Sequence, residues 1–444
     1  MPAQATTAVV ALGKIGLPLA VQFADRGHRV IGVDVSERQV SLVNQGLEPF
    51  PGEAHLAEKL AEIVPAGRLR ATTDYAEAIS AASTVVIVVP LFVDEATGEP
   101  DFGWMDEATR SLAPHLQPGT LVSYETTLPV GTLRDRFVPM IEEISGLRES
   151  EDFFAAFSPE RVLTGRVFED LRKYPKLFGA LSEEGAARTR AFYEDVLTFD
   201  ARPDLARENG VWDLGSPEAA ELAKLAETTY RDVNIALANE FALFAQDRGI
   251  DVYRVIEASN SQPFSHIHQP GIAVGGHCIP VYPRLYLSGD PAAETVRTAR
   301  ALNASVPARL VERAEELLGS LAGLRAVILG ASYRSGVKET AFSGVFPVAA
   351  ELRRRGAQVR VHDPLYTDEE LERLDLGAWH VGEEADLLIV QTNHAMYRDL
   401  TAADAPGVRL LVDGRNITSV EAWAGTPRLV LGDGSASTHR GPQE

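Results

Sequence analysis

The sequence predicts an α/β protein in which two doubly wound domains are joined by a central segment with a long helix. Near the N-terminus, short runs rich in β-branched residues alternate with stretches of helical period, at residues 7–12, 29–33, 85–89 and 121–124. The C-terminal third repeats this pattern at residues 326–329, 358–361, 387–390 and 410–412. Such alternation is typical of parallel sheets with crossover helices. Between the two parts, residues 218–248 contain neither Gly nor Pro, which predicts one helix about 45 Å long.

Composition limits the classes of function that need to be considered. The chain has 444 residues, of which 45% are hydrophobic, and this is enough for several packed cores. A formal net charge of -21 argues against a general binder of nucleic-acid backbones. The longest apolar run, at residues 84–93, is interrupted by Pro90 and is too short for a membrane helix. We therefore predict no nucleic-acid partner, no membrane partner and a cytoplasmic location, since the N-terminus also lacks the pattern of a signal peptide.

The first strand-like run leads into a turn typical of dinucleotide-binding sites. The turn reads Ala11-Leu12-Gly13-Lys14-Ile15-Gly16, and a helical stretch and a second strand follow it. Gly13 would let the backbone approach a pyrophosphate, and Gly16 would permit close packing of the helix against the strand. Ala11 takes the place of the first glycine of this fingerprint. An ordinary strand-turn-helix unit is the alternative, but the order of elements favours a Rossmann-like cofactor site.

Asp34, at the end of the second strand, indicates which dinucleotide binds. A carboxylate in this position accepts hydrogen bonds from ribose hydroxyls and repels a 2′-phosphate. We therefore predict NAD rather than NADP as the cofactor, although Arg38 nearby weakens that preference.

The single cysteine, Cys278, lies in Gly275-Gly276-His277-Cys278-Ile279-Pro280. One thiol can form neither an internal disulfide nor a multi-thiolate metal site, so we predict no metal and a reducing compartment. From residue type alone, an inert thiol and a nucleophile are equally good interpretations. Beside a nicotinamide, however, a thiolate can add to an aldehyde and give a thiohemiacetal with a second hydride to lose.

The long helix is expected to mediate assembly. It begins at Ser216-Pro217-Glu218, which matches an N-cap, a first-turn proline and a favourable acid, and Gly249 is a suitable residue to end it. Apolar positions recur along it at Leu222, Val233, Leu237 and Phe241. A rod this long seldom leaves such a face exposed, so we expect a homodimer or a larger homo-oligomer.

Motifs spread in order along nearly the whole chain form a specific set. They lie at residues 124–132, 158–162, 218–225, 234–240, 275–280, 329–334, 362–364 and 413–415. With this set the sequence resembles the UDP-glucose/GDP-mannose dehydrogenase family, and more closely its UDP-N-acetylglucosamine/UDP-N-acetylmannosamine dehydrogenase branch. The resemblance implies an NAD-dependent oxidoreductase that oxidises the C6 alcohol of a UDP-hexose or UDP-N-acetylhexosamine to a uronic acid, with two NAD and a cysteine thioester. Such products serve polysaccharide biosynthesis.

The resemblance also implies roles for particular residues. Cys278 would be the nucleophile, and Lys224 would stabilise the developing oxyanion. Glu160 would activate the water that hydrolyses the thioester, and Thr127 would hold a catalytic water. The nucleotide sugar would contact Arg161, Lys224, Gly276, Arg334 and Arg415. NAD would contact Gly13, Lys14, Ile15, Gly16, Asp34, Arg38 and Thr127.

Each of these roles has a structural alternative. Ser158-Pro159-Glu160 is also a good helix start, where Glu160 would only complement the helix dipole. Lys224 could be a solvated lysine on the face of the long helix. Arg334 and Arg415 could simply follow turns.

Several positions depart from the family pattern. Thr228 replaces an Asn and Tyr282 replaces an Asp, and both family residues help to position the lysine, the water and the oxyanion. Phe264 and Ala341 stand where the family has arginines, and residues 89–92 replace a Val-Pro-Thr-Pro segment at the cofactor. Two other functions therefore stay open. One is a relative that performs a single two-electron oxidation or uses an unusual nucleotide sugar, and the other is a catalytically silent protein that binds NAD and a sugar nucleotide.

The change of pattern along the chain predicts its division into domains. We expect an NAD-binding Rossmann-like domain over residues 1–205 and a central helical dimerisation segment with the cysteine loop over 206–305. A C-terminal UDP-sugar-binding α/β domain would cover 306–435, followed by a flexible tail over 436–444.

Overall fold

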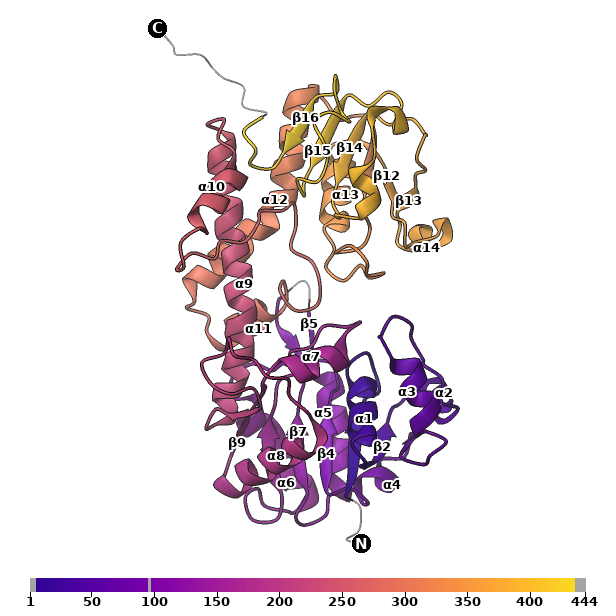
Figure 1. Cartoon of the computed structure of the whole chain (residues 1–444), viewed down its shortest axis with the longest axis vertical. Coiled ribbons are helices and arrows are strands. Elements are labelled where there is room, and N and C mark those ends of the chain that lie inside the picture. Colours follow the sequence, from indigo (N-terminus) through magenta and orange to yellow (C-terminus); the bar gives the residue numbers. More distant parts are fainter. Residues whose placement is uncertain (1–4, 95–96, 436–444) are drawn as a thin grey trace. The chain divides into compact units, whose positions relative to one another are not determined.

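The computed structural model describes residues 5–94 and 97–435, and the predicted flexible tail at 436–444 lies outside the described residues. The chain forms two compact units, one ending at Ala226 and one beginning at Glu227. Each unit is built on one large sheet of parallel or mostly parallel strands (Figure 1). The predicted class, two doubly wound α/β domains joined by a long-helix segment, is therefore confirmed.

The first unit contains a sheet with the strand order β10-β9-β8-β7-β4-β1-β2-β3. Its strands are β1 (Thr6–Val10), β2 (Arg29–Val33), β3 (Leu69–Thr72), β4 (Thr84–Ile87), β7 (Leu121–Tyr124), β8 (Phe154–Phe157), β9 (Lys176–Ala180) and β10 (Val211–Asp213). Neighbouring strands are parallel except β8 and β9, which run antiparallel. Successive side chains point to opposite faces, so Val9 and Val10 belong to different hydrophobic clusters, one on each face of the sheet.

Helices of the first unit contribute to both clusters. One cluster includes residues of α1 (Gly16–Asp25), α2 (Glu37–Asn44), α3 (Leu56–Ile63), α7 (Val167–Lys173) and α8 (Glu183–Val196). The other includes residues of α4 (Tyr75–Ile79), α5 (Gly103–Leu112) and α6 (Val138–Ser145). Three short elements complete the unit: a hairpin of β5 (Phe92–Val93) and β6 (Pro100–Asp101), a 3-10 helix η1 (Ala113–His115) and a π-helical turn η2 (Leu133–Phe137). This arrangement leaves the carboxyl ends of the strands as the edge where loops gather.

The direction of winding in this sheet reverses between β1 and β4. The chain passes from β1 outward to β2 and β3, and then returns to β4 on the other side of β1. In doubly wound sheets, ligands bind outside the carboxyl ends of the strands at such a switch point. The predicted cofactor turn at residues 11–16 directly follows β1 and therefore borders this point.

Helix α9 (Pro217–Gln246) runs from the first unit into the second. The Ser216 hydroxyl accepts a hydrogen bond from the Ala219 amide at 3.2 Å, so it caps the helix as predicted. At the other end Gly249 adopts a φ of 67°, and the Ile250 amide donates to the Ala245 carbonyl at 3.0 Å. The predicted long helix and both of its end signals are confirmed.

The second unit contains a parallel sheet with the order β13-β12-β11-β14-β15-β16. Its strands are β11 (Arg325–Leu329), β12 (Gln358–His362), β13 (Gly377–Ala378), β14 (Leu387–Val390), β15 (Leu410–Asp413) and β16 (Arg428–Val430). Its helices are α10 (Val252–Ser259), α11 (Tyr282–Gly289), α12 (Glu294–Leu318), α13 (Val345–Arg354) and α14 (Asp368–Arg373), with 3-10 turns η3 (Ala395–Arg398) and η4 (Ala402–Asp404). The switch point of this sheet lies between β11 and β14.

Two classes of feature are missing from the described part of the chain. Within residues 5–94 and 97–435, no helix combines the length and the apolar character needed to cross a membrane. The same ranges hold no group of three or more His, Cys, Asp or Glu side chains suited to a metal ion. The predicted domain limits at residues 205 and 305 stay predictions.

Candidate active site

The turn after β1 is closely packed around a backbone carbonyl. The Ala11 amide donates to the Val33 carbonyl at 2.8 Å, and Ala11 has a φ of 75°. A Cβ added to Gly16 would lie 1.9 Å from the Ala11 carbonyl oxygen, so α1 can begin here only with glycine at this position. The sequence interpretation of Gly16 as the contact between helix and strand is thus consistent with the packing of the turn.

The same turn leaves room for an anionic group at the start of α1. A Cβ added to Gly13 would have no atom within 4 Å, so this position faces open space. Ile15 caps α1 without a side-chain hydrogen bond, and the first turn of the helix carries no acidic residue. A helix N-terminus in this state favours negative charge, and these residues therefore fit a dinucleotide pyrophosphate.

Asp34 is oriented by the backbone around it. Its Oδ2 accepts a hydrogen bond from the Leu12 amide at 2.8 Å, and its Oδ1 accepts one from the Ser36 amide at 2.9 Å. Each carboxylate oxygen retains a further lone pair, which can accept a ribose hydroxyl. Arg38 is exposed nearby on α2. Apart from Thr127, which follows β7, the predicted cofactor residues thus lie between the end of β1 and the start of α2.

A buried cluster of ionisable groups surrounds Glu160 at the ends of β7, β8 and β9. The Lys176 ammonium donates to Glu125 Oε2 at 2.6 Å and to Glu160 Oε2 at 2.9 Å. The Tyr193 hydroxyl donates to Glu125 Oε1 at 2.7 Å. The Glu160 side chain is 10% exposed and that of Lys176 only 4%. The residue that the resemblance assigns as a base therefore lies in a largely dry environment.

The charges in this cluster decide which groups are ionised. Burial raises the pKa of Glu125, and the charge of Lys176 works against that rise. For Glu160, burial also favours the neutral form, but Lys176, the Arg161 amide and the charge of Lys224 together bring the pKa below its usual value. Burial opposes the charge of Lys176, yet the two carboxylates raise its pKa. Glu160 is consequently a carboxylate at neutral pH, as a base must be.

The structure decides two of the alternatives that the sequence leaves open. No helix begins at Ser158, because residues 158–163 form an irregular segment and α7 starts at Val167, so Glu160 does not complement a helix dipole. Lys224 is buried rather than exposed on the face of α9, and Thr127 is buried in the loop after β7. Thr127, Glu160 and Lys224 all belong to the first unit.

Glu221, one helical turn before Lys224, joins α9 to the loop that carries Thr127. Sequence analysis did not select it, although its place in the 218–225 motif was a signal. Its Oε2 accepts a hydrogen bond from the Gly131 amide at 2.6 Å, and its Oε1 accepts one from the Leu133 amide at 3.0 Å. Burial raises the pKa of Glu221 to about 7.

The raised pKa of Glu221 predicts a pH-dependent stability. A carboxyl group whose pKa is higher in the folded state contributes stability that is fully present below its unfolded pKa and is lost as the pH rises through its folded pKa. Between pH 5 and pH 8 the free energy of unfolding of the wild type should fall by about 2.5 kcal/mol relative to Glu221→Gln. Urea unfolding of both proteins at the two pH values measures this difference, and an equal offset at both would contradict the prediction.

In the second unit, the cysteine loop is seated on the loop that follows β11. A Cβ added to Gly275 would lie 2.7 Å from Tyr333 Cβ, and one added to Gly276 would lie 3.0 Å from the Tyr333 ring. The Gly276 amide donates to the Ala341 carbonyl at 2.8 Å. Only glycines allow this approach, which fixes the backbone just before the half-buried Cys278. The paired glycines of the motif therefore position the thiol.

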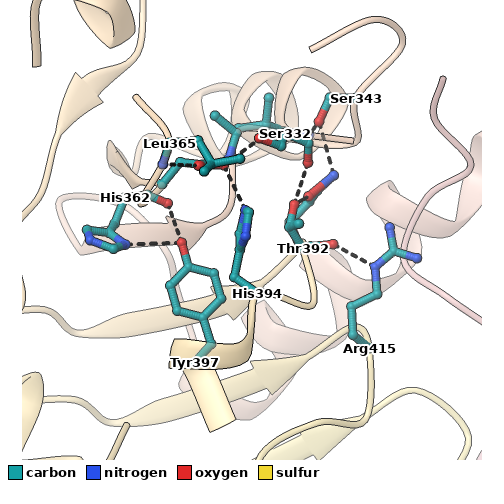
Figure 2. Close-up of polar contacts among 12 residues, drawn as sticks. Ser332, Ser343, His362, Leu365, Thr392, His394, Tyr397 and Arg415 are labelled. Atoms are coloured by element: carbon teal, nitrogen blue, oxygen red, sulfur yellow. Dashed lines mark hydrogen bonds and ion pairs between the residues drawn. The ribbon is translucent and has the colours of Figure 1, made fainter. Parts of the chain in front are cut away.

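Arg415, two residues after β15, supports the segment that leads to the cysteine loop. Its Nε donates to the Gln391 carbonyl at 2.6 Å (Figure 2). One Nη donates to the Ala273 carbonyl at 3.3 Å. A Cβ added to Gly271 would lie 2.7 Å from the other Nη. Loss of water around the guanidinium lowers the pKa of Arg415 to about 10, so it remains a cation.

Arg334 is more exposed than Arg415. It follows β11 and donates to the Tyr333 hydroxyl at 3.1 Å. The second unit thus places Gly276, Cys278, Arg334 and Arg415 around the carboxyl ends of β11 and β15.

The turn after β11 has the same hydrogen bonds as the turn after β1, but other groups fill the space beside it. The Gly330 amide donates to the His362 carbonyl at 2.7 Å, as Ala11 does to Val33, and the Ala331 amide donates to Asp363 at 2.8 Å, as Leu12 does to Asp34. The Asp363 carboxylate, however, also accepts hydrogen bonds from the Ser332 and Leu365 amides and contacts His394 at 3.2 Å; these groups surround it in Figure 2. Burial opposes its charge, but these hydrogen bonds lower the pKa of Asp363 to about 2.

Thr392 fills the crevice of this second turn. A Cβ added to Gly330 would lie 2.3 Å from the Thr392 side chain. With Asp363 fully engaged and Thr392 in place, this turn lacks the open space found at Gly13. The first unit is therefore the one whose turn fits a dinucleotide.

Comparison with known proteins places the whole chain in one family. The NAD-binding domain of the UDP-glucose/GDP-mannose dehydrogenase family matches residues 5–197, its central domain 218–306 and its UDP-binding domain 327–420. The chain is 34% identical over 424 residues to UDP-N-acetyl-D-mannosamine dehydrogenase of Pyrococcus horikoshii, covering 92% of this chain and 95% of that protein. It is 32% identical over 438 residues to the enzyme of the same name from Methanocaldococcus jannaschii, covering 96% of each.

A solved structure agrees with this assignment. The UDP-D-ManNAc dehydrogenase of Pyrococcus horikoshii superposes with a TM-score of 0.84 at 31% identity, over 97% of this chain and 100% of that one. The two sheets, the helical segment between them and the dinucleotide turn thus have counterparts along the full length of a known enzyme. The chain belongs to the UDP-glucose/GDP-mannose dehydrogenase family and is an NAD-dependent nucleotide-sugar dehydrogenase.

Proposed function

We propose that the protein oxidises the C6 alcohol of a UDP-N-acetylhexosamine, UDP-N-acetyl-D-mannosamine in the first instance, to the corresponding uronic acid. The names of the relatives support this substrate. The observation that carries the reaction type is the ionised, buried Glu160, because hydrolysis of a thioester requires a base that an enzyme performing a single oxidation does not need.

The reaction proceeds in three stages. NAD supplies the hydride acceptor for both oxidations. After the first oxidation, the Cys278 thiolate adds to the C6 aldehyde, and loss of a second hydride converts the thiohemiacetal into a thioester. Lys224 stabilises the oxyanion that develops on the substrate. Water then attacks the carbonyl carbon, Glu160 takes its proton, the carbon–sulfur bond breaks and the thiolate leaves.

The arginines of the second unit supply charge for the diphosphate. Arg334 and Arg415 follow β11 and β15, and a guanidinium can pair with two phosphate oxygens at once. Gly276 would bring backbone close to the sugar, and Arg161 would also contact the sugar nucleotide. At Tyr282, the phenol or a water that it holds would take over part of the role of the missing carboxylate.

The number of NADH molecules formed per sugar tests this function directly. With UDP-N-acetyl-D-mannosamine, UDP-N-acetylglucosamine and UDP-glucose offered separately, absorbance at 340 nm compared with sugar consumed should give a ratio of two for one N-acetylated substrate. A ratio of one would favour the single oxidation that the replacements Thr228 and Tyr282 leave open. A ratio of zero with all three sugars, despite binding, would show a catalytically silent protein.

We also propose that α9 forms the interface of a homodimer. Its apolar residues Leu222, Leu237 and Phe241 are 43%, 42% and 38% exposed in the single chain, whereas Val233 is half-buried. A second copy would remove this surface from water. Light scattering at micromolar concentration should give twice the mass of the chain, and Leu237→Glu/Phe241→Glu should give the mass of one chain. A wild-type monomer would contradict the proposal.

A further inference from the structure

A buried lysine, Lys176, and a second glutamate, Glu125, contact each other beside Glu160. Glu125 lies in the 124–132 motif, but the sequence assigned a role to neither residue. Lys176 Nζ bridges Glu125 Oε2 at 2.6 Å and Glu160 Oε2 at 2.9 Å. We propose that Lys176 and Glu125 are positioning residues that together set the orientation and the basicity of Glu160 in thioester hydrolysis. The inference rests on the proposed function and concerns its last stage.

Two hydrogen-bond donors, one on each oxygen, fix the orientation of the Glu160 carboxylate. Glu160 Oε2 accepts from Lys176, and Glu160 Oε1 accepts from the Arg161 amide at 2.7 Å. The segment before Glu160 is anchored as well, because the Ser158 hydroxyl donates to the Leu177 carbonyl at 2.7 Å. Each oxygen of Glu160 still has a lone pair free of these donors, so the carboxylate is fixed in direction and can still accept a proton from water.

The basicity of Glu160 depends on Lys176 being shared with a second carboxylate, that of Glu125. During hydrolysis Glu160 changes from charged to neutral. If Lys176 faced Glu160 alone, that change would leave a buried ammonium without a counter-charge, which is strongly unfavourable. The same attraction would make Glu160 too weak a base. Glu125 neutralises Lys176 whether Glu160 is charged or neutral. Lys176 can therefore orient Glu160 by a hydrogen bond without preventing its protonation.

Glu125 is suited to this permanent pairing. It is 1% exposed, and the Tyr193 hydroxyl donates to its Oε1 at 2.7 Å, opposite the oxygen bound by Lys176. The Ser123 and Tyr193 hydroxyl oxygens are 2.7 Å apart, which continues the network toward β7. Burial raises the pKa of Glu125, but the charge of Lys176 and a donor on each oxygen oppose that rise and favour Glu125 as the charged partner of Lys176.

Other charged and titratable groups face Glu160 and must be included in any pH argument. Lys224 on α9 adds a positive charge that lowers the pKa of Glu160. Glu160 and Lys176 also line a small recess whose other polar residues are Arg161, Asp170 and Tyr174. These groups remain unchanged in the variants proposed below, so any shift between variants reports on Lys176 and Glu125.

The pH dependence of thioester hydrolysis tests the proposal. The Cys278 adduct is formed in a single turnover with substrate and NAD, and its decay is followed by quenching and mass spectrometry from pH 5 to pH 9. The hydrolysis rate should fall at low pH as Glu160 becomes protonated, and we call this part of the profile the acidic limb. In Lys176→Met the midpoint of the acidic limb should rise by about one to three pH units, because the variant lacks the cation next to Glu160. In Glu125→Gln the limb should stay below pH 5, where the lowered pKa of Glu160 also places it in the wild type, and the plateau rate should fall roughly three- to tenfold as Glu160 becomes a weaker base. A role in packing alone would slow Lys176→Met without moving its limb.

Three further variants test whether the effect depends on the charge of residue 176, on its position, and on correct folding. Lys176→Arg keeps a cation at the site and should keep the limb within half a unit of the wild type, roughly the limit of such a measurement. Lys173→Met makes the same substitution at an exposed lysine on α7 and should leave the profile unchanged. Lys176→Met alone leaves two buried carboxylates without their cation, so Lys176→Met/Glu125→Gln removes both charges of the pair and should show the raised limb in a folded protein.

The outcomes separate this inference from the proposed function. If Glu160→Gln forms no adduct on Cys278, the proposed function itself is wrong. If Glu160→Gln accumulates adduct but Lys176→Met and the double variant keep the wild-type limb, the function stands and the inference is overturned. If neither Lys176 variant folds, Glu125→Gln decides, since it retains the pair of Lys176 and Glu160, and a plateau rate equal to that of the wild type would overturn the inference.

Discussion

Replacing Glu160 with Gln is expected to stop the reaction after the second oxidation, with the sugar nucleotide still attached to Cys278. Thiolate addition and loss of hydride do not require activated water, whereas hydrolysis of the thioester does. A general base contributes about 10²–10⁴-fold, so the steady-state rate should fall by that factor. Mass spectrometry of acid-quenched Glu160→Gln should show one adduct, and its place is defined because Cys278 is the single cysteine of the chain.

Cys278 variants provide the control for this experiment. Cys278→Ser should give neither adduct nor comparable turnover, while it should bind NAD as the wild type does. Two results would show that the covalent mechanism is wrong for this protein. One is a Glu160→Gln enzyme that binds substrate and NAD but accumulates no adduct, and the other is a Cys278→Ala enzyme with normal four-electron turnover.

Replacing Gly16 with Ala is expected to weaken NAD binding by distorting the turn that holds the cofactor. The new Cβ would lie 1.9 Å from the Ala11 carbonyl oxygen and 3.1 Å from its carbon, and neither backbone atom can rotate away as a side chain can. Overpacking of this kind costs about 1–3 kcal/mol, and if this cost falls on the cofactor-bound turn it corresponds to a loss of affinity of roughly five- to 150-fold. Titration of NAD followed by fluorescence measures this loss, and the melting temperature should fall even without NAD.

Gly13→Ala is the matched comparison for Gly16→Ala. The space around Gly13 is open to at least 4 Å, so the methyl group should leave the melting temperature of the NAD-free protein unchanged. It would, however, occupy the space where the pyrophosphate approaches the backbone, and NAD affinity should fall. Wild-type NAD affinity in both variants would show that this turn does not hold the cofactor.

The turns after β1 and after β11 have similar local geometry but differ in the space that they leave for a ligand. Asp34 and Asp363 each follow the second strand of a doubly wound unit, and each accepts an amide from the turn after the first strand. Asp34 keeps lone pairs for a ribose, whereas Asp363 is enclosed by His394 and further amides. Strand pattern alone predicts both turns, but the loop after β14, which inserts Thr392, decides that only the first is open.

The sequence alone determined the α/β class, the cofactor turn and the long helix, because each depends on a local pattern. Alternation of apolar runs predicts parallel strands, Gly16 and Asp34 mark a strand-helix-strand unit, and Ser216 and Gly249 delimit α9 through hydrogen bonds to near neighbours. Such features can be recognised in a sequence because the interacting groups are only a few residues, or one supersecondary unit, apart. The assignment of Glu160 and Cys278 as candidates came from the resemblance of motifs, not from periodicity.

Only the tertiary structure decided what surrounds those candidates. Lys176 meets Glu125 across 51 residues of chain and Glu160 across 16, because the order of β7, β8 and β9 brings their ends together. Periodicity states which face a side chain occupies but not which distant carboxylate it will meet. Whether Glu160 is a helix-start acid or a buried base, and whether Lys224 is solvated or buried, depends on how strands and helices separated in sequence pack and exclude water, since that packing sets the local charge and dielectric.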